Sequence, residues 1–232
     1  MCIWCRKTEN DVSFNKLAHT FPKSLGGKSI CENVCDTCNH YFGSPRAKSP
    51  AIEVVLKELL NISKFYLLNQ SKTVLRGNRF KSEFFDANWT TNTIRLKLRY
   101  SLRKGSQERF GRLFRQGLYK VFLEEREVQR HDSLNSRFDF IREFARYDLS
   151  DYPVYYIKPK LPVIFFSEED TKSPMIRFTE YSDSLDSEFR IFEYQIFGHS
   201  FCIPTSRNFE TLCLRWLFRS DHASLFGQMV PL

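Results

Sequence analysis

The cysteines at the start of this chain constrain its fold more than any other feature of the sequence. Cys2 and Cys5 form one CxxC pair, Cys35 and Cys38 form a second, and 29 residues separate the two pairs. Each CxxC turn presents two thiolates about one tetrahedral edge apart, so two turns complete a four-cysteine zinc site. We therefore predict a structural zinc ion here rather than a set of buried, reduced cysteines.

A zinc ion would also explain how so short a segment folds. Residues 1–43 contain two short extended pieces, a glycine loop and the start of a helix, which is too little to be stable without a staple. Cys31 lies outside the CxxC pattern and is either an exchanged ligand or a spectator. Cys202 and Cys213 are predicted to be core residues. A zinc closed by four cysteines has no open position, so any chemistry must come from the residues that it holds in place.

The sequence predicts a globular cytoplasmic protein with no membrane span. No uninterrupted apolar run approaches the roughly 18 residues that cross a bilayer, and the start "MCIWCRKTEN" does not resemble a targeting segment. In a reducing compartment, cysteines crowded in this way favour a metal over disulfides.

Basic residues concentrate in the middle of the chain. Residues 72–120 contain 13 Lys or Arg but only three acidic residues, Glu83, Asp86 and Glu108. This excess is typical of a surface that binds a polyanion, most simply nucleic acid, although a solvated helix face is the alternative. Within it, residues 90–105 alternate apolar side chains with Arg95, Lys97 and Arg99, which predicts a strand with a cationic face.

Hydrophobic periodicity predicts an α+β body after the turn-rich linker 43–50. Apolar residues at helical spacing predict helices over 51–69 and 106–131, and a third helix after Asp132 and Ser133, which are good N-cap types. From about residue 151, aromatic and β-branched runs separated by polar turns predict antiparallel strands, including 161–170, 175–183 and 188–204.

The segment between the cysteine pairs contains further motifs in a fixed order. "AHTFPKSLGG" (18–27) is followed by "CDTCNHYF" (35–42), so a histidine, a Gly-Gly loop, a CxxC and an Asn-His pair follow one another. This arrangement resembles the HNH, or ββα-metal, endonucleases over roughly residues 1–43. The resemblance implies a hairpin and a helix around one catalytic divalent cation, Mg2+ or Mn2+.

The resemblance also implies roles for individual residues. His19 matches the general base, a role that suits an imidazole titrating near neutral pH. Asn39 matches the final motif residue, a ligand of the cation, and Asn33 is a looser match to the middle one. His40 is a further candidate ligand, and Lys23 and Lys28 are candidates to hold neighbouring phosphates.

One position departs from the family pattern. Many members carry an acidic ligand immediately before the histidine, where this chain has Ala18. Either water and substrate phosphates complete the metal shell, or an acid from elsewhere contributes, with Asp36 and Glu53 as candidates beside His40. A third alternative is a site that binds without cleaving.

Together these patterns predict an α+β protein with an N-terminal HNH module (1–50) and a body (51–232) that includes the basic part 72–120 and the β-rich part 151–232. The predicted function is metal-dependent cleavage of nucleic acid, with double-stranded DNA as the expected substrate and antiphage defence or a mobile element as the expected setting. The alternatives are an inactive zinc-containing nucleic-acid-binding protein and a zinc-stapled adaptor. The β-rich part is expected to contact a protein partner or a second copy of the chain.

Overall fold

The computed structural model describes residues 1–46, 49–69, 80–88, 91, 93–101, 105–158, 167–219 and 228–232. The helices are α1 (Asp36–Gly43), α2 (Ile52–Asn69), α3 (Leu98–Ser101), α4 (Ser106–Arg130), α5 (Asp139–Ala145), α6 (Glu168–Lys172), α7 (Glu180–Phe189) and α8 (Glu210–Arg219), with 3-10 turns η1 (Lys23–Leu25) and η3 (Ser136–Phe138). The strands are β1 (Phe85–Asn88), β2 (Thr93–Leu96), β3 (Tyr155–Lys158), β4 (Ile191–Ile196), β5 (His199–Pro204) and β6 (Gln228–Pro231).

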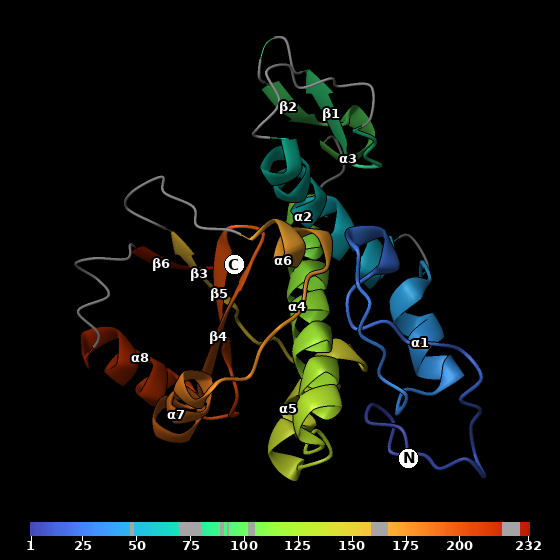
Figure 1. Cartoon of the computed structure of the whole chain (residues 1–232), viewed down its shortest axis with the longest axis vertical. Coiled ribbons are helices and arrows are strands. Elements are labelled where there is room, and N and C mark those ends of the chain that lie inside the picture. The colour runs from blue at the N-terminus through green and yellow to red at the C-terminus, as the bar shows by residue number, and fades with distance from the viewer. Residues whose placement is uncertain are drawn as a thin grey trace.

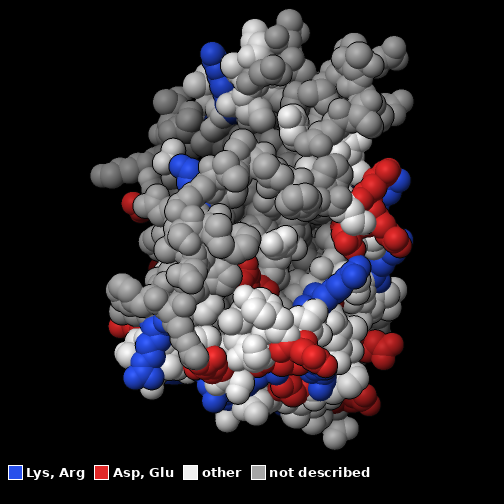
Figure 2. Space-filling model, turned by 60° about the vertical axis from the view of Figure 1, so that its left-hand side comes forward, with Lys and Arg blue, Asp and Glu red and all other residues white. Residues whose placement is uncertain are grey.

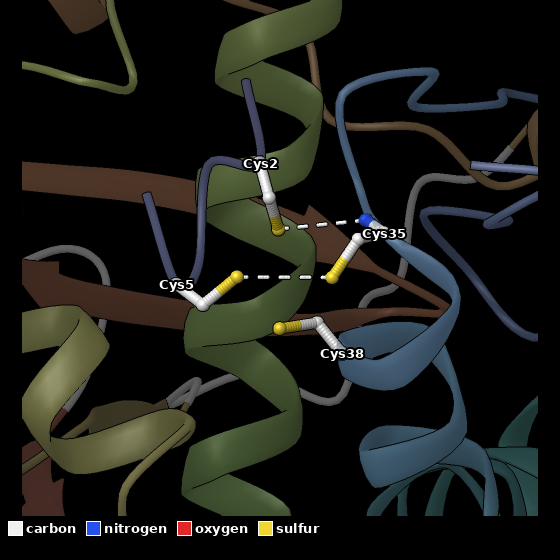
Figure 3. Close-up of side chains that lie close together, drawn as sticks. All are labelled: Cys2, Cys5, Cys35 and Cys38. Carbon is white, nitrogen blue, oxygen red and sulfur yellow. Dashed lines mark hydrogen bonds between the residues drawn. The ribbon is translucent and has the colours of Figure 1, made fainter. Parts of the chain in front are cut away.

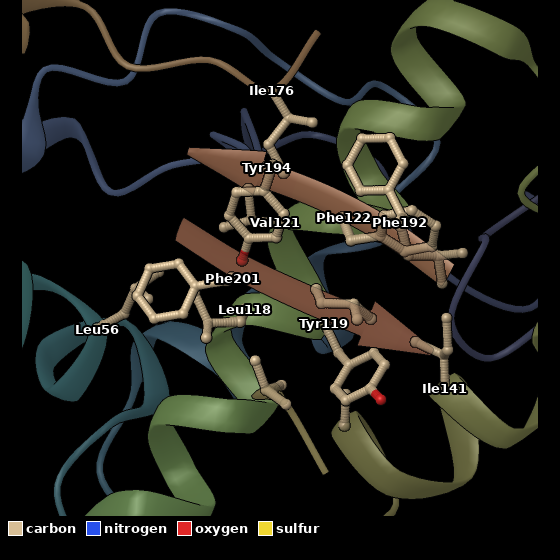
Figure 4. Close-up of a cluster of buried hydrophobic side chains, with 14 of the residues drawn as sticks. Leu56, Leu118, Tyr119, Val121, Phe122, Ile141, Ile176, Phe192, Tyr194 and Phe201 are labelled. Atoms are coloured by element: carbon tan, nitrogen blue, oxygen red, sulfur yellow. The ribbon is translucent and has the colours of Figure 1, made fainter. Parts of the chain in front are cut away.

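Helix α4 runs through the middle of the molecule and separates the N-terminal segment from the main sheet (Figure 1). Its apolar face packs on the sheet, where the Phe122 ring lies 5.1 Å from that of Phe192 and the Phe114 ring lies 5.8 Å from that of Phe201 (Figure 4). The predicted helices at 51–69 and 106–131 are confirmed as α2 and α4. The structure is α+β, as predicted.

The main sheet is antiparallel, with strand order β4-β5-β3-β6. Strands β4 and β5 form a tight hairpin whose two turn residues, Phe197 and Gly198, both have positive φ. A two-residue turn of this kind matches the twist of the paired strands. The predicted strand region 188–204 is thus confirmed as this hairpin.

Two other predicted strands fare differently. The prediction at 175–183 is wrong, because Thr179 and Ser182 form a capping box that starts α7 at Glu180. In the stretch 161–170, residues 161–166 lie outside the described residues, and α6 occupies Glu168–Lys172. The expectation of uniform β structure after residue 151 therefore missed helices α6, α7 and α8.

The third predicted helix is present but begins later than its sequence suggested. Phe138, Ile141, Phe144 and Ala145 are all fully buried along η3 and α5, as the spacing predicted. Asn135 caps this region instead of Asp132 and Ser133, since its side chain accepts a hydrogen bond from the backbone N–H of Arg137. The side chain of Asp132 instead pairs with Arg126.

The predicted cationic strand is also only partly correct. Thr93–Leu96 forms β2, which pairs with β1, but the chain then turns into α3 at Leu98. A helical turn rotates successive side chains by about 100° and not by half a turn. Arg95 and Arg99 therefore do not share one strand face, and the side chain of Arg99 lies outside the described residues.

Helix α2 lies close against α4 because α4 carries a glycine at the crossing point. A Cβ atom at Gly117 would lie 3.2 Å from the Leu56 Cβ atom and 3.5 Å from a methyl carbon of Ile52. Glycine there, although unfavourable within a helix, lets the two backbones approach. Helix α2 in turn supports the loop that precedes α1, because Lys64 donates a hydrogen bond to the Leu25 carbonyl oxygen.

The N-terminal segment folds as a short hairpin followed by a helix. His19 and Ile30 form an antiparallel bridge, with flanking backbone hydrogen bonds from Thr20 to Ser29 and from Cys31 to Ala18. Helix α1 follows directly. This is the ββα order expected of the module, with the strands reduced to a single bridge.

The polar face of α4 binds this segment. The indole N–H of Trp4 donates to Glu124, the Thr20 hydroxyl donates to Glu125, and the Asn33 side chain donates to Glu127. All three glutamates are buried. Both faces of α4 are therefore covered, one by apolar side chains of the sheet and the other by the hairpin and cysteine turns.

Among the described helices, none combines the length and the apolar character that a membrane-spanning segment needs.

Candidate functional site

The four predicted zinc ligands come together. The Sγ atoms of Cys2, Cys5, Cys35 and Cys38 all lie within 4.8 Å of one another, and those of Cys5 and Cys35 are 3.7 Å apart (Figure 3). Sulfurs bound tetrahedrally to zinc at about 2.3 Å lie about 3.8 Å apart. The donor set and its spacing thus fit a structural zinc ion. Among the described residues, no other group of three or more His, Cys, Asp or Glu side chains gathers in this way.

Each pair of cysteines is held by local backbone structure. The first turn is closed by a hydrogen bond from the Arg6 N–H to the Cys2 carbonyl oxygen, and Arg6 has a φ of 59°. In the second turn, Cys35 occupies the N-cap position of α1 and Cys38 lies in its first turn. The backbone N–H of Cys35 also points at the Cys2 sulfur, at 3.4 Å. The two turns therefore face each other across the four sulfurs.

The thiols of this group do not titrate alike. A hydrogen bond from Cys38 lowers the pKa of Cys2 to about 4, whereas burial raises the pKa of Cys35 to about 11. The hydrogen bond to Cys2 raises the pKa of Cys38. Zinc binds thiolates and displaces the protons of the thiols, so metal affinity increases with pH.

The remaining cysteines are spectators. Cys31 is buried outside the four-sulfur group, and burial raises its pKa. This resolves the alternative in favour of a core residue over an exchanged ligand. Cys202 and Cys213 are buried in the β-rich half, as predicted.

His19 lies on the first strand of the hairpin, and the side chain of Lys120 holds its backbone by hydrogen bonds. Its neighbours Ala18 and Thr20 are buried, while His19 itself is partly exposed. The Nζ atom of Lys120 donates to the carbonyl oxygen of His19 at 2.6 Å and to that of Thr20 at 3.1 Å. Because strand side chains alternate, the buried Ala18 points away from the face that presents His19. The imidazole Nδ1 is buried and has no hydrogen-bond partner among the described residues.

Helix α1 lies against the same strand. The side-chain nitrogen of Asn39 donates to the carbonyl oxygen of Leu17, at 3.3 Å, two residues before His19. No described residue donates a hydrogen bond to the Asn39 amide oxygen, and oxygen is the ligand atom that Mg2+ and Mn2+ prefer. His40 is exposed, with Nδ1 3.0 Å from the Ser44 hydroxyl. Asn39 therefore lies beside the strand of His19, while the contact of His40 is to Ser44 within the same helix end.

The other candidate ligands are engaged by the protein. Asn33 donates to Glu127 at 2.6 Å, which joins its loop to α4. Asp36 accepts hydrogen bonds from the Ser13 hydroxyl and the Lys16 backbone, and the Ser13 contact lowers its pKa. Glu53 pairs with Lys120 at 2.9 Å. A cation near Asn39 would thus rely largely on water and substrate oxygens to complete its shell.

The glycine loop between His19 and α1 has a structural requirement of its own. Gly26 has a φ of 89°, and a Cβ atom there would collide with the Lys172 carbonyl oxygen at the end of α6. The loop can therefore approach α6 only because Gly26 has no side chain. Lys23 and Lys28 lie on either side of it and are exposed.

The basic stretch 72–120 is less exposed than its sequence implied. Arg112 pairs with Asp148 at 2.8 Å, Arg115 pairs with Asp151 at 2.8 Å, and Lys120 is buried. The paired acids come from outside the counted window, so the local excess overstated the surface charge. Basic and acidic side chains also lie next to one another on the face drawn in Figure 2.

Two exposed cations remain around β1 and β2, although Asp86 lies directly opposite Arg95 in the paired strands. Lys81 and Arg95 are exposed, while Lys97 donates to the Ser82 carbonyl oxygen and lies 3.9 Å from Asp86. Lys72, Arg76, Arg79, Arg103 and Lys104 lie outside the described residues. We define Lys81 and Arg95 as the β1–β2 basic pair.

The order of hairpin, cysteine turns and helix can now be compared with known proteins. Residues 2–48 match the HNH endonuclease family. The matched segment, called the HNH module below, contains the four cysteines, His19 and Asn39, and is similar to HNH endonucleases. No curated protein and no solved structure matches the chain.

Sequence reasoning missed the residues that support the HNH module from α4. Lys120 and Glu124 are spaced i, i+4. The basic stretch 72–120 includes Lys120 as a surface cation and ends before Glu124. The signal that could have found them is the density of charged residues on a helix whose other face is continuously apolar, followed by Glu124, Glu125 and Glu127 in close succession. A helix with one apolar and one charged face can be buried on both sides when polar groups of another segment cover the charged face.

Proposed function

We propose that this chain is a divalent-metal-dependent endonuclease that hydrolyses phosphodiester bonds in DNA through its HNH module. The observation that carries the proposal is the placement of the His19 strand beside Asn39 of α1, within a segment that matches the HNH endonuclease family. The four-cysteine site holds the two elements together and takes no part in the chemistry, since it has no open position.

In this proposal His19 is the general base. Its imidazole accepts a proton from a water molecule, whose oxygen forms a bond to the scissile phosphorus while the bond to the leaving 3′ oxygen breaks. The leaving oxygen takes up a proton from solvent, which gives a 5′-phosphate and a 3′-hydroxyl. Asn39 and His40 would hold the Mg2+ or Mn2+ ion, which supplies charge stabilisation when bound.

Other residues bind and position the substrate. Lys23 and Lys28, exposed on either side of the glycine loop, would contact phosphates next to the cleaved bond. Arg95, Lys97 and Arg99, together with Lys81, would contact the backbone further away. Lys120 fixes the carbonyl groups of His19 and Thr20 and so sets the position of the base. The β-rich part would bind a protein partner or a second copy, and antiphage defence or a mobile element is the setting that we propose.

A non-cleaving nucleic-acid-binding protein is the second candidate. It is favoured by the state of the candidate carboxylate positions that the structure describes: residue 18 is a buried alanine, and Asp36 and Glu53 bond to other protein groups. Such a protein would retain the zinc site and the affinity for DNA but would leave the DNA intact.

The decisive experiment measures conversion of supercoiled plasmid to nicked or linear DNA with Mg2+ or Mn2+. The full-length chain is compared with His19→Ala and with His131→Asn, which replaces an exposed histidine in left-handed conformation by a residue that tolerates it. We expect cleavage by the wild type and by His131→Asn, and loss of cleavage by about a hundredfold or more in His19→Ala.

Binding measured with Ca2+ in place of the active cation separates the two candidates. Retained DNA affinity in His19→Ala alongside lost cleavage supports a catalytic role for His19. Cleavage that survives in His19→Ala contradicts the proposed mechanism, and tight binding without cleavage by the wild type favours the second candidate.

A further inference from the structure

One face of α5 contacts both cysteine turns. Asp139, Arg142 and Arg146 follow one another at intervals of three and four residues along and just beyond the helix, which places their side chains on one side of it. No local motif links this helix to the cysteines, which lie about a hundred or more residues earlier in the chain.

The first cysteine turn is held by two of these side chains. The Nε atom of Arg142 donates to the carbonyl oxygen of Ile3, between Cys2 and Cys5, at 2.6 Å. Asp139 pairs at 2.6 Å with Arg6, which directly follows Cys5. Arg142 is only 4% exposed, so its hydrogen bond to the turn is made away from solvent. The backbone that presents the first two sulfurs is therefore fixed from α5.

The third side chain reaches a sulfur directly. The Nε atom of Arg146 donates to Cys38 Sγ at 3.2 Å. Its guanidinium group lies over the Tyr41 ring, 4.2 Å from the ring centroid, one helical turn away from the metal-binding end of α1. Stacking on Tyr41 leaves few orientations for the guanidinium plane, so the hydrogen bond to the sulfur is directed and not incidental.

The charge of an occupied site explains what this contact would do. Four thiolates outweigh the charge of one zinc ion, so the filled site is a partly buried anion. A buried anion is costly unless hydrogen bonds and opposite charge compensate for it. We propose that α5 is the outer shell of the zinc site, in which Arg146 compensates the Cys38 thiolate and Arg142 holds the Cys2–Cys5 turn in the geometry that binds zinc.

This assignment links zinc occupancy to the body of the protein. Arg146 joins Cys38 of α1 to the end of α5, so the zinc ligands and the body share this contact. The site therefore takes part in the contact between module and body as well as within the module.

The test is the zinc affinity of the full-length chain, measured by competition with a chromogenic chelator. Arg146→Gln is compared with the wild type and with Arg207→Gln, in which an exposed arginine that also contacts α5, through Glu143, is lost without touching a cysteine. We expect Arg146→Gln to bind zinc about tenfold or more weakly, as is common for outer-shell changes, and Arg207→Gln to match the wild type.

A second readout separates a direct contact from general loosening. With Co2+ in place of zinc, loss of a hydrogen bond to one thiolate should shift the sulfur-to-cobalt charge-transfer band in Arg146→Gln but not in Arg207→Gln. If Arg146→Gln is insoluble, Arg146→Lys keeps the charge but loses the in-plane donor, and we expect it to weaken zinc binding to a smaller degree.

Three outcomes would overturn the proposal. These are wild-type zinc affinity in the Arg146 variants, an equal loss of affinity in Arg146→Gln and Arg207→Gln, or a wild-type chain that binds no zinc at the four cysteines. None of these measurements depends on nuclease activity.

Discussion

The ammonium nitrogen of Lys120 lies 2.6 Å from the carbonyl oxygen of His19. The same nitrogen lies 2.9 Å from carboxylate oxygens of Glu53 and Glu124, and the Lys120 side chain is 1% exposed. A buried cation is therefore shared between two acids and the strand of the proposed catalytic base. The contact makes the position of His19 depend on α4, although 101 residues separate the two in sequence.

Replacing this lysine should destabilise the protein strongly. Lys120→Met keeps the aliphatic volume but leaves the buried Glu124 without its cation, and breaking a buried ion pair in this way costs on the order of 3 kcal/mol. We expect the free energy of unfolding in urea to fall by about that amount. The exposed Lys23→Met is the control and should change it by less than about 0.5 kcal/mol. Equal effects of the two changes would show that Lys120 is not a buried anchor.

The stability of the protein should depend on the ionisation of Glu124. Burial raises the pKa of Glu124 to about 7 despite the nearby Lys120. The folded state then binds a proton more tightly than the unfolded state, so this stabilisation is full below about pH 4.5 and is lost as the pH rises to about 7. We expect the wild type to lose free energy of unfolding over this range relative to Glu124→Gln, which cannot ionise. Parallel pH profiles of the two proteins would contradict the raised pKa.

Zinc should be lost when one member of the four-sulfur group is replaced. Cys35→Ser removes a ligand whose sulfur lies 3.7 Å from that of Cys5. We expect metal analysis to find bound zinc in the wild type and little in Cys35→Ser, with a lower melting temperature. Cys31→Ser is the matched control, because Cys31 is equally buried but lies outside the group. Zinc retained in Cys35→Ser, or lost equally in Cys31→Ser, would refute the ligand assignment.

The glycine loop should tolerate no side chain at Gly26. Gly26→Ala adds a collision with Lys172 to the strain of a positive φ, whereas Gly105→Ala adds the strain alone, since nothing lies within 4 Å of its Cβ position. We expect Gly105→Ala to lower the free energy of unfolding by about 1 kcal/mol and Gly26→Ala to lower it clearly more, as measured by unfolding in urea. If the two variants were equally stable, the close approach of the loop to α6 would be wrong.

The β1–β2 basic pair should contribute to nucleic-acid affinity, whereas the cations of α4 should not. Lys81→Glu with Arg95→Glu is expected to weaken DNA binding and to lower the slope of log affinity against log salt by about one to two. Arg112→Gln, which disrupts the pair with Asp148, should leave that slope unchanged. An unchanged slope in the double variant, or a reduced slope in Arg112→Gln, would place the binding surface elsewhere.

Much of the candidate site could be predicted from the sequence because its signals are local. The CxxC spacing of Cys35 and Cys38 predicted their grouping, and the order of His19 and Asn39 between the cysteine turns indicated the family. The hydrogen bond of Asn33 to Glu127 and the ion pair of Glu53 with Lys120 could not be predicted from the sequence, because the partners lie far apart along the chain.

The sequence by itself determined the four-cysteine group, the long helices α2 and α4, and the hairpin at 188–204, since spacing, periodicity and turn residues act over a few positions. Only the tertiary structure decided which charges are exposed. Arg112, Arg115 and Lys120 look like a polyanion-binding surface when counted along the chain, but Asp148, Asp151 and Glu53 neutralise them after folding. The physical reason is that charge compensation depends on distance in space, and a window of sequence contains only one partner of each such pair.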